Sequence, residues 1–139
     1  MKKSVLILCT GNSARSQMAE GLFRHEGGDH YVVHSAGTKP SIVRPEAIAV
    51  MGELGIDLSG HRSKSVDEFS NANLDYVITV CDNAKESCPI FPATVERLHW
   101  PFEDPASVVG SEEERQAAFR KVRDQIRARI REWLGALPA

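Results

Sequence analysis

A cysteine and an arginine six positions apart mark the stretch of this chain whose residue types are best suited to chemistry. Cys9 directly follows the apolar run at residues 5–8, and residues 9–16 read Cys-Thr-Gly-Asn-Ser-Ala-Arg-Ser. A strand that ends in a tight turn before a helix directs several backbone N–H groups toward one point, where the helix N-terminus adds positive potential. The planar guanidinium of Arg15 can bind two oxygens of an anion. The pattern therefore predicts a loop that holds a tetrahedral oxyanion against Cys9.

The same positive field stabilises the ionised form of Cys9, so we expect a thiolate nucleophile near neutral pH. Taken alone, Cys9 also fits a small apolar residue at a strand end, since cysteines outside disulfides are among the most buried residue types. The strand before it, the Gly-Asn-Ser turn and the Arg-Ser pair together favour the nucleophile. The expected oxyanion-binding residues are Thr10, Gly11, Asn12, Ser13, Ala14, Arg15 and Ser16.

Length and charge limit the classes of function. The 139 residues suffice for one domain, and a net charge of −2 gives no general attraction to nucleic acid or to an anionic membrane. No apolar stretch approaches a membrane span, and the apolar run at residues 5–8 is too short for a secretory signal. We therefore predict a cytoplasmic protein with no nucleic-acid partner and no membrane partner.

The chain has three cysteines, Cys9, Cys81 and Cys88. An odd, small number of cysteines in a reducing compartment does not indicate a structural disulfide framework. No histidine stands at metal-ligand spacing from them, so the sequence predicts no metal site. Taken singly, Cys81 fits a buried residue at a strand end, and Cys88 fits an incidental thiol before proline. The three together favour nucleophilic or redox chemistry.

Short apolar runs rich in β-branched residues alternate with segments of helical periodicity. This alternation predicts an α/β fold, a single domain with a four-stranded parallel sheet and helices on both faces. Ligands of such sheets bind beyond the carboxyl ends of the strands, where we expect Cys9, Cys81 and the loop after Trp100 to meet. The expected strands lie at residues 5–8, 31–37, 74–81 and 95–100, and the expected helices at 13–27, 45–54, 65–69, 82–88 and from 111 onward.

The last predicted helix combines an apolar stripe with many arginines. Three glutamates at residues 112–114 occupy its first turn and the arginines follow, an order that complements the helix dipole. A docking surface for a partner is the alternative interpretation of these arginines. The stripe is Phe119, Val122, Ile126, Ile130, Trp133 and Leu137, and the arginines are Arg115, Arg120, Arg123, Arg127, Arg129 and Arg131.

Four motifs resemble the low-molecular-weight protein tyrosine phosphatase superfamily, and more closely its thioredoxin-coupled arsenate reductase branch. The resemblance runs essentially from end to end and implies the fold of that superfamily. The first motif alone indicates the superfamily, and the C-x6-C pair of Cys81 and Cys88 selects the reductase branch. The motifs are residues 9–20, 35–37, 80–81 with 88–89, and 99–105.

The resemblance implies which residues carry the first chemical step. Arsenate is a tetrahedral oxyanion close to phosphate in shape and charge, so phosphate and sulfate are expected as competing ligands. Cys9 is expected to attack arsenic while Asp104 donates a proton to the departing oxygen as general acid. Ser16 is expected to donate a hydrogen bond to the Cys9 sulfur, and Asn12 to brace the loop.

The resemblance also implies a relay of three cysteines. Attack of Cys81 on the Cys9 sulfur would expel arsenite and leave a disulfide between these two residues. Attack of Cys88 on Cys81 would then release Cys9, and thioredoxin would reduce the resulting Cys81–Cys88 disulfide. No tightly bound cofactor is implied, thioredoxin being the electron donor, and a monomer is expected.

Helix geometry has a consequence for the segment between the two redox cysteines. If residues 82–88 are helical, Cys81 and Cys88 lie ~10 Å apart along the helix axis. A disulfide needs Cα atoms within ~7 Å of each other. Pro89 blocks continuation of the helix. We therefore predict that residues 82–92 rearrange on oxidation and change their amide-exchange protection.

Two positions depart from the pattern of the resembled branch. Ala14 stands where relatives often carry another cysteine, and because the relay does not use that thiol we expect no loss of activity. Some members bind potassium through residues matching Asn12, Glu20 and Ser35, together with an acidic residue whose position is occupied here by Lys64. The ammonium of Lys64 either takes the place of the cation and pairs with Glu20, or points to solvent.

Two further functions stay open at this point. A phosphatase would use Cys9, Arg15 and Asp104 and neither of the redox cysteines. Phosphatases of this fold usually carry aromatic residues just after the Asp-Pro pair, whereas residues 106–109 here are Ala-Ser-Val-Val, which weakens that alternative. A non-catalytic redox sensor or phosphoprotein-binding module would be favoured only by an intact but inactive protein.

Overall fold

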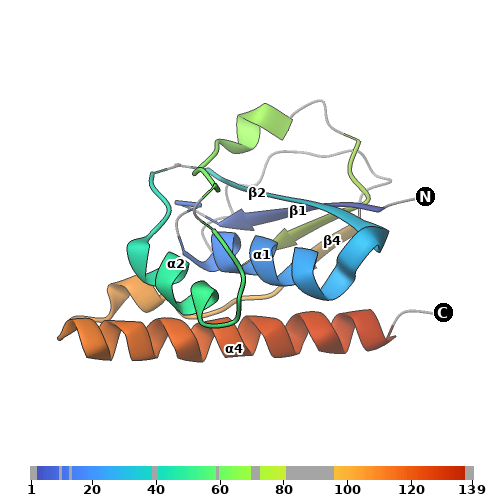
Figure 1. Cartoon of the computed structure of the whole chain (residues 1–139). Helices are drawn as coiled ribbons and strands as arrows, with labels where there is room; N and C mark the ends of the chain where they lie inside the picture. Colours follow the sequence, from blue (N-terminus) through green and yellow to red (C-terminus); the bar gives the residue numbers. More distant parts are fainter. Residues whose placement is uncertain are drawn as a thin grey trace.

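Four parallel strands form a single sheet (Figure 1). The computed structural model describes residues 3–9, 11–12, 14–38, 41–58, 60–69, 73–80 and 96–136. Neighbouring strands pair in parallel in the order β2-β1-β3-β4. The predicted α/β class with a four-stranded parallel sheet is therefore confirmed. The strands are β1 (Lys3–Cys9), β2 (Tyr31–Gly37), β3 (Tyr76–Thr79) and β4 (Glu96–His99).

Helical segments connect and cover these strands. Within the described ranges there are three α-helices and three short 3-10 helices. The α-helices are α1 (Arg15–Gly27), α2 (Pro45–Gly52) and α4 (Glu112–Ala136), and the 3-10 helices are η1 (Gly28–His30), η2 (Val66–Phe69) and η3 (Pro105–Ser107).

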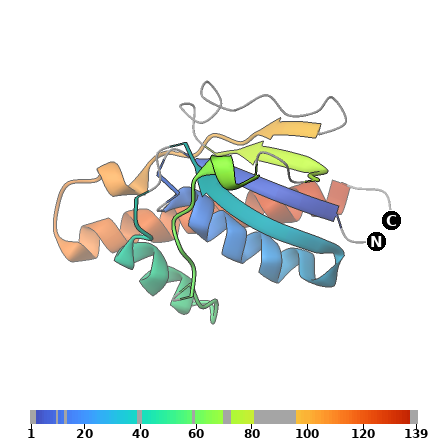
Figure 2. The same cartoon turned by 90° about the horizontal axis from the view of Figure 1, so that it is seen from above.

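The long helices cover one face of the sheet. In Figure 1, α1 and α4 pack against each other below the strands, and α2 contacts both. η2 lies on the opposite face, where the ring of Phe69 approaches that of His34 on β2 to 5.2 Å between centroids. The view from above shows the strands in front of the helices (Figure 2). Helical segments therefore lie on both faces of the sheet, as predicted.

β1 is one of the two inner strands and brings Cys9 to its position. It pairs with β2 on one side and β3 on the other, so Leu6 stands opposite both His34 and Val77. A strand with parallel neighbours on both edges and helical segments on both faces has no side exposed to water. Such a strand needs a continuous apolar run. Residues 5–8 supply it, and each of their side chains is at most 1% exposed.

The apolar stripe of α4 closes the core from below. Helical spacing puts its members on one face, and four of them are fully buried. Trp133, one turn further on, lies at the centre of an aromatic cluster, with four ring centroids between 5.0 and 6.1 Å from its own. The buried stripe residues are Phe119, Val122, Ile126 and Ile130, and the rings around Trp133 are those of Phe23, Tyr31, Tyr76 and Trp100.

The arginines of α4 do not follow the predicted dipole pattern. Its first turn holds the three glutamates, but its last turn holds no basic residue, so the basic half of that prediction was wrong. Four of the arginines instead form ion pairs with carboxylates at the end of α2 and on α1. These pairs fasten α4 to its neighbours, a role visible only in the tertiary structure. The pairs are Arg120 and Arg123 with Glu53, and Arg127 and Arg131 with Glu26.

Some predicted boundaries differ from the structure. The helix expected at residues 65–69 is the 3-10 helix η2, preceded by an isolated bridge between Ser65 and Gly37. β3 and β4 are each shorter than the runs at 74–81 and 95–100 suggested. The helix expected at 82–88 lies outside the described residues, as does Leu137 of the α4 stripe.

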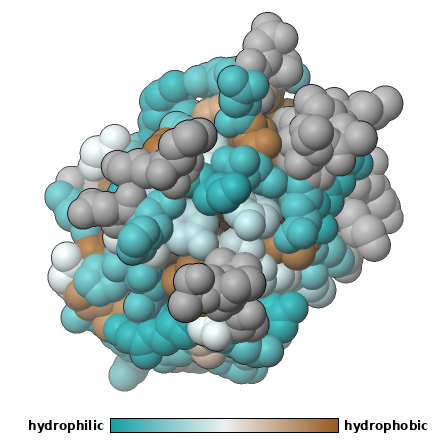
Figure 3. All heavy atoms as spheres, turned by 90° about the vertical axis from the view of Figure 1, so that its right-hand side faces the viewer, coloured by the Kyte–Doolittle hydropathy of each residue, from teal (hydrophilic) through white to brown (hydrophobic). Residues whose placement is uncertain are grey.

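The outer surface can be followed on one side of the molecule. Figure 3 shows the face at the amino ends of the strands, where polar residues prevail and hydrophobic ones occupy small separate areas. In the part of the chain that the structure describes, no helix is both long enough and apolar enough to cross a membrane.

Candidate active site

The candidate site begins where β1 ends. Cys9 is the last residue of that strand and is a reduced cysteine only 4% exposed, with Gly37 of β2 as its neighbour in the sheet. Arg15 is the first residue of α1, so the turn between strand and helix is short. Of the predicted binding residues, Thr10 and Ser13 lie outside the described residues, whereas Gly11, Asn12, Ala14, Arg15 and Ser16 are described.

The loop after β4 brings the predicted general acid to this turn. Nη1 of Arg15 donates a hydrogen bond to the backbone oxygen of Phe102 at 2.9 Å, and Nη2 of Arg15 lies 4.0 Å from Oδ2 of Asp104. The N–H of Phe102 in turn donates to the carbonyl of Val80, which fixes the loop to the end of β3. The Asp104 side chain is 44% exposed. Its carboxyl is therefore accessible beside the guanidinium that would bind an anion.

Asn12 holds the turn in shape from within. Its φ is 47°, a left-handed conformation that costs a residue other than glycine free energy, and the residue is fully buried. Nδ2 donates to Oγ of Ser16 at 2.8 Å and to Oγ of Ser35 at 2.9 Å. Oδ1 accepts the backbone N–H of Lys64 at 2.8 Å. One side chain thus joins α1, β2 and the segment at residues 62–64.

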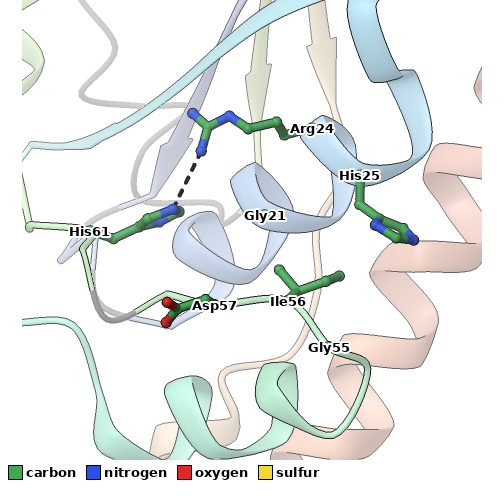
Figure 4. A pocket seen from close by; sticks show the side chains of 7 residues that line it. All are labelled: Gly21, Arg24, His25, Gly55, Ile56, Asp57 and His61. Atoms are coloured by element: carbon green, nitrogen blue, oxygen red, sulfur yellow. Dashed lines mark hydrogen bonds between the residues drawn. The ribbon is translucent and has the colours of Figure 1, made fainter.

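Gln17 supports the turn from behind. Nε2 donates to the backbone oxygen and Oδ1 of Asn12 and to the backbone oxygen of Arg62, all within 3.1 Å. Oε1 faces Nδ1 of His61 at 2.9 Å. Nη1 of Arg24 faces Nε2 of the same ring at 3.4 Å, the contact drawn as a dashed line in Figure 4. Because arginine can only donate, the ring proton belongs on Nδ1, from which it is donated to Gln17. Burial lowers the pKa of His61, which favours this neutral form.

Sequence reasoning did not single out Gln17 or His61, and of residues 62–64 it named only the side chain of Lys64. Residues 62–64 run beside the turn and reach β2 as well, where the N–H of Gly37 donates to the carbonyl of Lys64 at 2.8 Å. Some of the hydrogen bonds from residues 62–64 are made by backbone groups. Every residue type has these groups, so the sequence gives no signal for such bonds. Gln17 did carry a signal, since it is a polar residue among the buried residues of α1.

Lys64 and Arg24 both pair with the buried carboxylate of Glu20. Nζ of Lys64 lies 3.7 Å from Oε1 of Glu20, and the side chains of Lys64 and Glu20 are 13% and 6% exposed. Glu20 also accepts hydrogen bonds from Arg24 and from Oγ of Ser35. The prediction that Lys64 pairs with Glu20 is confirmed, and the solvent-directed alternative is wrong. The cluster does not fit a potassium ion, because an ammonium is already beside Glu20 and Asn12 turns its amide nitrogen toward Ser35.

Two hollows lie near this framework. One of about 220 Å³ opens beside the Arg24–His61 hydrogen bond, with Asp57 and Ile56 on its far wall (Figure 4). The other, of about 270 Å³, follows residues 99–102, where the guanidinium of Arg129 lies 5.5 Å from the centre of the Trp100 ring. Among the residues that the structure describes, no three His, Cys, Asp or Glu side chains gather as ligands for a metal ion.

The ends of β1 and β3 lie side by side. The N–H of Val80 donates to the carbonyl of Leu8 at 2.9 Å, so residue 80 stands next to the strand that ends at Cys9. The predicted redox residues Cys81 and Cys88 lie outside the described residues. For the described part, the geometry gives a buried thiol, a guanidinium at the start of a helix and an accessible carboxyl at one edge of the sheet. That set suits nucleophilic attack on a tetrahedral oxyanion.

Known proteins resemble this chain over almost its whole length. The family model of the low molecular weight phosphotyrosine protein phosphatases matches residues 4–139. The chain belongs to this family. An arsenate reductase from Shouchella clausii (strain KSM-K16) is 46% identical to the chain over 132 residues, which are 95% of each protein. An arsenate reductase from Bacillus subtilis (strain 168) is 45% identical over 131 residues, 94% of each.

Solved structures of this family share the fold over nearly the whole chain. An arsenate reductase in the phosphate-binding state superposes with a TM-score of 0.77 at 33% identity, covering 98% of this chain and 99% of that one. A low molecular weight protein tyrosine phosphatase from T. tengcongensis gives 0.81 at 26% identity, covering 98% and 100%. A thioredoxin-dependent arsenate reductase from Corynebacterium glutamicum gives 0.75 at 30%, covering 97% of this chain and 61% of that one. The predicted resemblance is confirmed.

Proposed function

We propose that this chain reduces arsenate to arsenite, with Cys9 as the nucleophile, Cys81 and Cys88 as the redox pair, and thioredoxin as the reductant. The observation that carries the proposal is the likeness, over about 95% of the chain, to relatives named arsenate reductases. The C-x6-C pair of Cys81 and Cys88 adds to it, because a phosphatase has no use for these two thiols.

In the first step, the Cys9 thiolate attacks arsenic and a sulfur–arsenic bond forms. Arg15 binds two oxygens of the anion, and Asp104 protonates a third, which leaves as water when its bond to arsenic breaks. The distance of 4.0 Å between Nη2 of Arg15 and Oδ2 of Asp104 supports these roles, because two groups so close together can contact the same anion. Ser16 accepts a hydrogen bond from Asn12, so its own hydroxyl proton can be donated to the Cys9 sulfur.

In the second step, the Cys81 thiolate attacks the Cys9 sulfur. The sulfur–arsenic bond breaks and its electron pair stays on arsenic, so arsenic(V) leaves as arsenite while Cys9 and Cys81 become a disulfide. The Cys88 thiolate then attacks Cys81, and Cys9 leaves as a thiolate. The dithiol of thioredoxin reduces the Cys81–Cys88 disulfide and so supplies the two electrons. The side-by-side ends of β1 and β3 support the first exchange, and the thioredoxin-dependent relative supports the last.

The same proposal covers the setting in which the protein works. We expect the protein to work in the cytoplasm, because a relay that starts from reduced thiols needs a reducing compartment. We also expect a monomer with no tightly bound cofactor. Phosphate and sulfate are expected to compete with arsenate, since they share its tetrahedral shape and charge. The relative solved in its phosphate-binding state supports this expectation.

The first experiment is thioredoxin-coupled oxidation of NADPH after addition of arsenate. The wild type should sustain turnover, and Cys88→Ser should stop after about one turnover per molecule, because the Cys9–Cys81 disulfide can no longer be resolved. Ser87→Ala, a change at the neighbouring position, is the matched control and should keep sustained turnover. Hydrolysis of an aryl phosphate by Cys88→Ser would show that its first-step residues are intact.

A phosphatase is the second candidate, favoured by the family to which the chain belongs and by the tyrosine phosphatase from T. tengcongensis with the same fold. It would use Cys9, Arg15 and Asp104 and would release its intermediate to water. No arsenate-dependent turnover in the wild type, together with aryl phosphate hydrolysis that survives loss of both Cys81 and Cys88, would replace the reductase by this function.

A further inference from the structure

The carbonyl oxygen of Gly11, in the middle of the anion-binding turn, accepts hydrogen bonds from two serines that lie outside the turn. Oγ of Ser63 donates to it at 2.8 Å, the N–H of Ser41 at 3.1 Å, and Oγ of Ser41 at 3.3 Å. Oγ of Ser63 also accepts the N–H of Ser41 at 2.9 Å. The Ser63 hydroxyl is therefore used as donor and acceptor at once, and its proton is directed at Gly11.

The direction of the Gly11 carbonyl decides the direction of the next N–H. A trans peptide group is planar, so its C=O and N–H point to opposite sides. The C=O of Gly11 points outward to Ser63 and Ser41, and the N–H of Asn12, which belongs to the same peptide, therefore points to the inner side of the turn. The inner side is where an oxyanion held against Cys9 has to lie.

The two sides of this peptide are held by different groups. On the Asn12 side, the side chain and the backbone oxygen are bound by Lys64 and Gln17, among others. On the Gly11 side, the shortest hydrogen bond comes from Ser63. A carbonyl oxygen turned inward would place negative charge next to the thiolate and the anion. An N–H turned inward stabilises both.

We propose that Ser63 is a positioning residue that keeps the Gly11 carbonyl away from the bound oxyanion and aims the Asn12 N–H at it. This inference rests on the proposed role of the turn as the oxyanion site, and it applies to arsenate and phosphate alike. Ser63 acts through the backbone of the turn and touches neither the anion nor Cys9.

A purely structural role of Ser63 would have different measurable effects. Ser63 would then only anchor the segment at residue 41 by accepting its N–H, and its loss would lower the melting temperature without changing the chemistry of Cys9. Threonine and valine at this position separate the two roles. They have nearly the same shape, and only threonine keeps the hydroxyl.

The test follows Cys9 itself, in a background of Cys81→Ser and Cys88→Ser where it is the only cysteine of the three. The rate of its alkylation by iodoacetamide, measured against pH and against phosphate concentration, gives the pKa of the thiol and the affinity for phosphate. For Ser63→Ala and Ser63→Val we expect a Cys9 pKa raised by about half to one unit and phosphate binding weakened by about tenfold. Ser63→Thr should resemble the background protein.

Ser65→Ala is the matched control, because Ser65 is half-buried on the same segment and its Oγ accepts only the local N–H of Asp67, at 3.2 Å, among the hydrogen bonds described. It should leave the Cys9 pKa and the phosphate affinity unchanged. Equal values for Ser63→Thr and Ser63→Val would overturn the proposal, whether or not Ser63→Ala folds. Since the assay involves no arsenate reduction, a Thr–Val difference in a protein without arsenate turnover would overturn the proposed function alone.

Discussion

The side chain of Asn12 stabilises an unfavourable conformation of its own backbone. Its left-handed φ of 47° costs about 1 kcal/mol relative to an ordinary conformation. Each hydrogen bond that its side chain makes to a buried partner contributes about 1 kcal/mol. The bonds to Ser16, Ser35 and Lys64 therefore outweigh that cost. Glycine would relieve the backbone at this position but would give up all of these bonds.

We predict that Lys64 makes the stability of the cluster around Glu20 independent of external cations. We expect equal melting temperatures in potassium chloride and sodium chloride of the same concentration, because the ammonium already lies 3.7 Å from Glu20. Lys64→Ala should lower the free energy of unfolding by about 2–3 kcal/mol, since it removes a partner of a carboxylate that is 6% exposed. Thermal and chemical unfolding in both salts measure these effects.

The control for this prediction is Lys121→Ala. Lys121 pairs with Glu103 at 3.2 Å, but both side chains are more than 60% exposed, so the loss should be within about 0.5 kcal/mol. A rise in the melting temperature of the wild type with potassium but not with sodium would show that the ammonium has not replaced a cation.

At the scale of elements, Trp133 packs α4 against the strands. The indole lies among rings contributed by α1, β2, β3 and the residue after β4. We expect Trp133→Ala to lower the free energy of unfolding by about 2–4 kcal/mol, with Trp133→Phe costing much less. Urea unfolding followed by far-UV circular dichroism measures this. Equal stabilities of the two variants would show that the cluster does not fasten α4.

The proposed relay requires residues 82–92 to rearrange, because this segment links Cys81 to Cys88 and continues beyond it. Its predicted rearrangement on oxidation concerns residues outside the described ranges, so it stays a prediction. Amide exchange should differ between the reduced protein and the Cys81–Cys88 disulfide form within these residues, and should match in β1. Equal protection of the segment in both forms would contradict it.

The sequence predicted the strands and most of the helices well, and the hydrogen bonds that support the turn after β1 poorly. The apolar run at residues 5–8 predicted a doubly buried strand because burial on both faces demands such a run. The motif around Cys9 predicted the partner Arg15, which is local, and the resemblance supplied Asp104. Hydrogen bonds such as that from Lys64 N–H to Asn12 join segments far apart in the chain, and no local pattern encodes them. The ion pairs of the α4 arginines were missed for the same reason.

The pH dependence of stability is a property of the whole molecule. Burial lowers the pKa of both His34 and His61. An unfolded histidine binds a proton as the pH falls through about 6.5, whereas these two in the folded protein do so only at lower pH. The unfolded state then binds more protons, so the free energy of unfolding decreases as the pH falls below about 6.5.

Two carboxylates extend this loss into more acid solution. Hydrogen bonds from Arg120 and Arg123 hold the pKa of Glu53 at about 2, and those from Arg127 and Arg131 lower that of Glu26 against the opposing effect of its burial. Their stabilising contribution is present above about 4.5, the pKa of an unfolded glutamate, and is lost as the pH falls through the folded values.

Chemical unfolding at several pH values between about 7 and 5 checks the histidine part of this prediction. His34→Gln and His61→Gln should each flatten the fall in unfolding free energy over that range. His30→Gln, at an exposed position, serves as the control and should keep the slope of the wild type. A slope that neither of the buried substitutions changes would assign the pH dependence to other groups.

The position of α4 in the chain affects how the protein folds while it is synthesised on the ribosome. α1, which begins with Arg15, packs along α4, yet all four strands are synthesised before α4 begins at Glu112. When Cys9 and its turn have left the exit tunnel of the ribosome, the nascent chain still lacks α4. This is the helix that covers α1 and closes the core. Domains fold as units, so the ordered turn should appear only after α4 leaves the exit tunnel. Until then we expect Cys9 to be an ordinary thiol, so the nascent chain would carry its proposed nucleophile in an unactivated form.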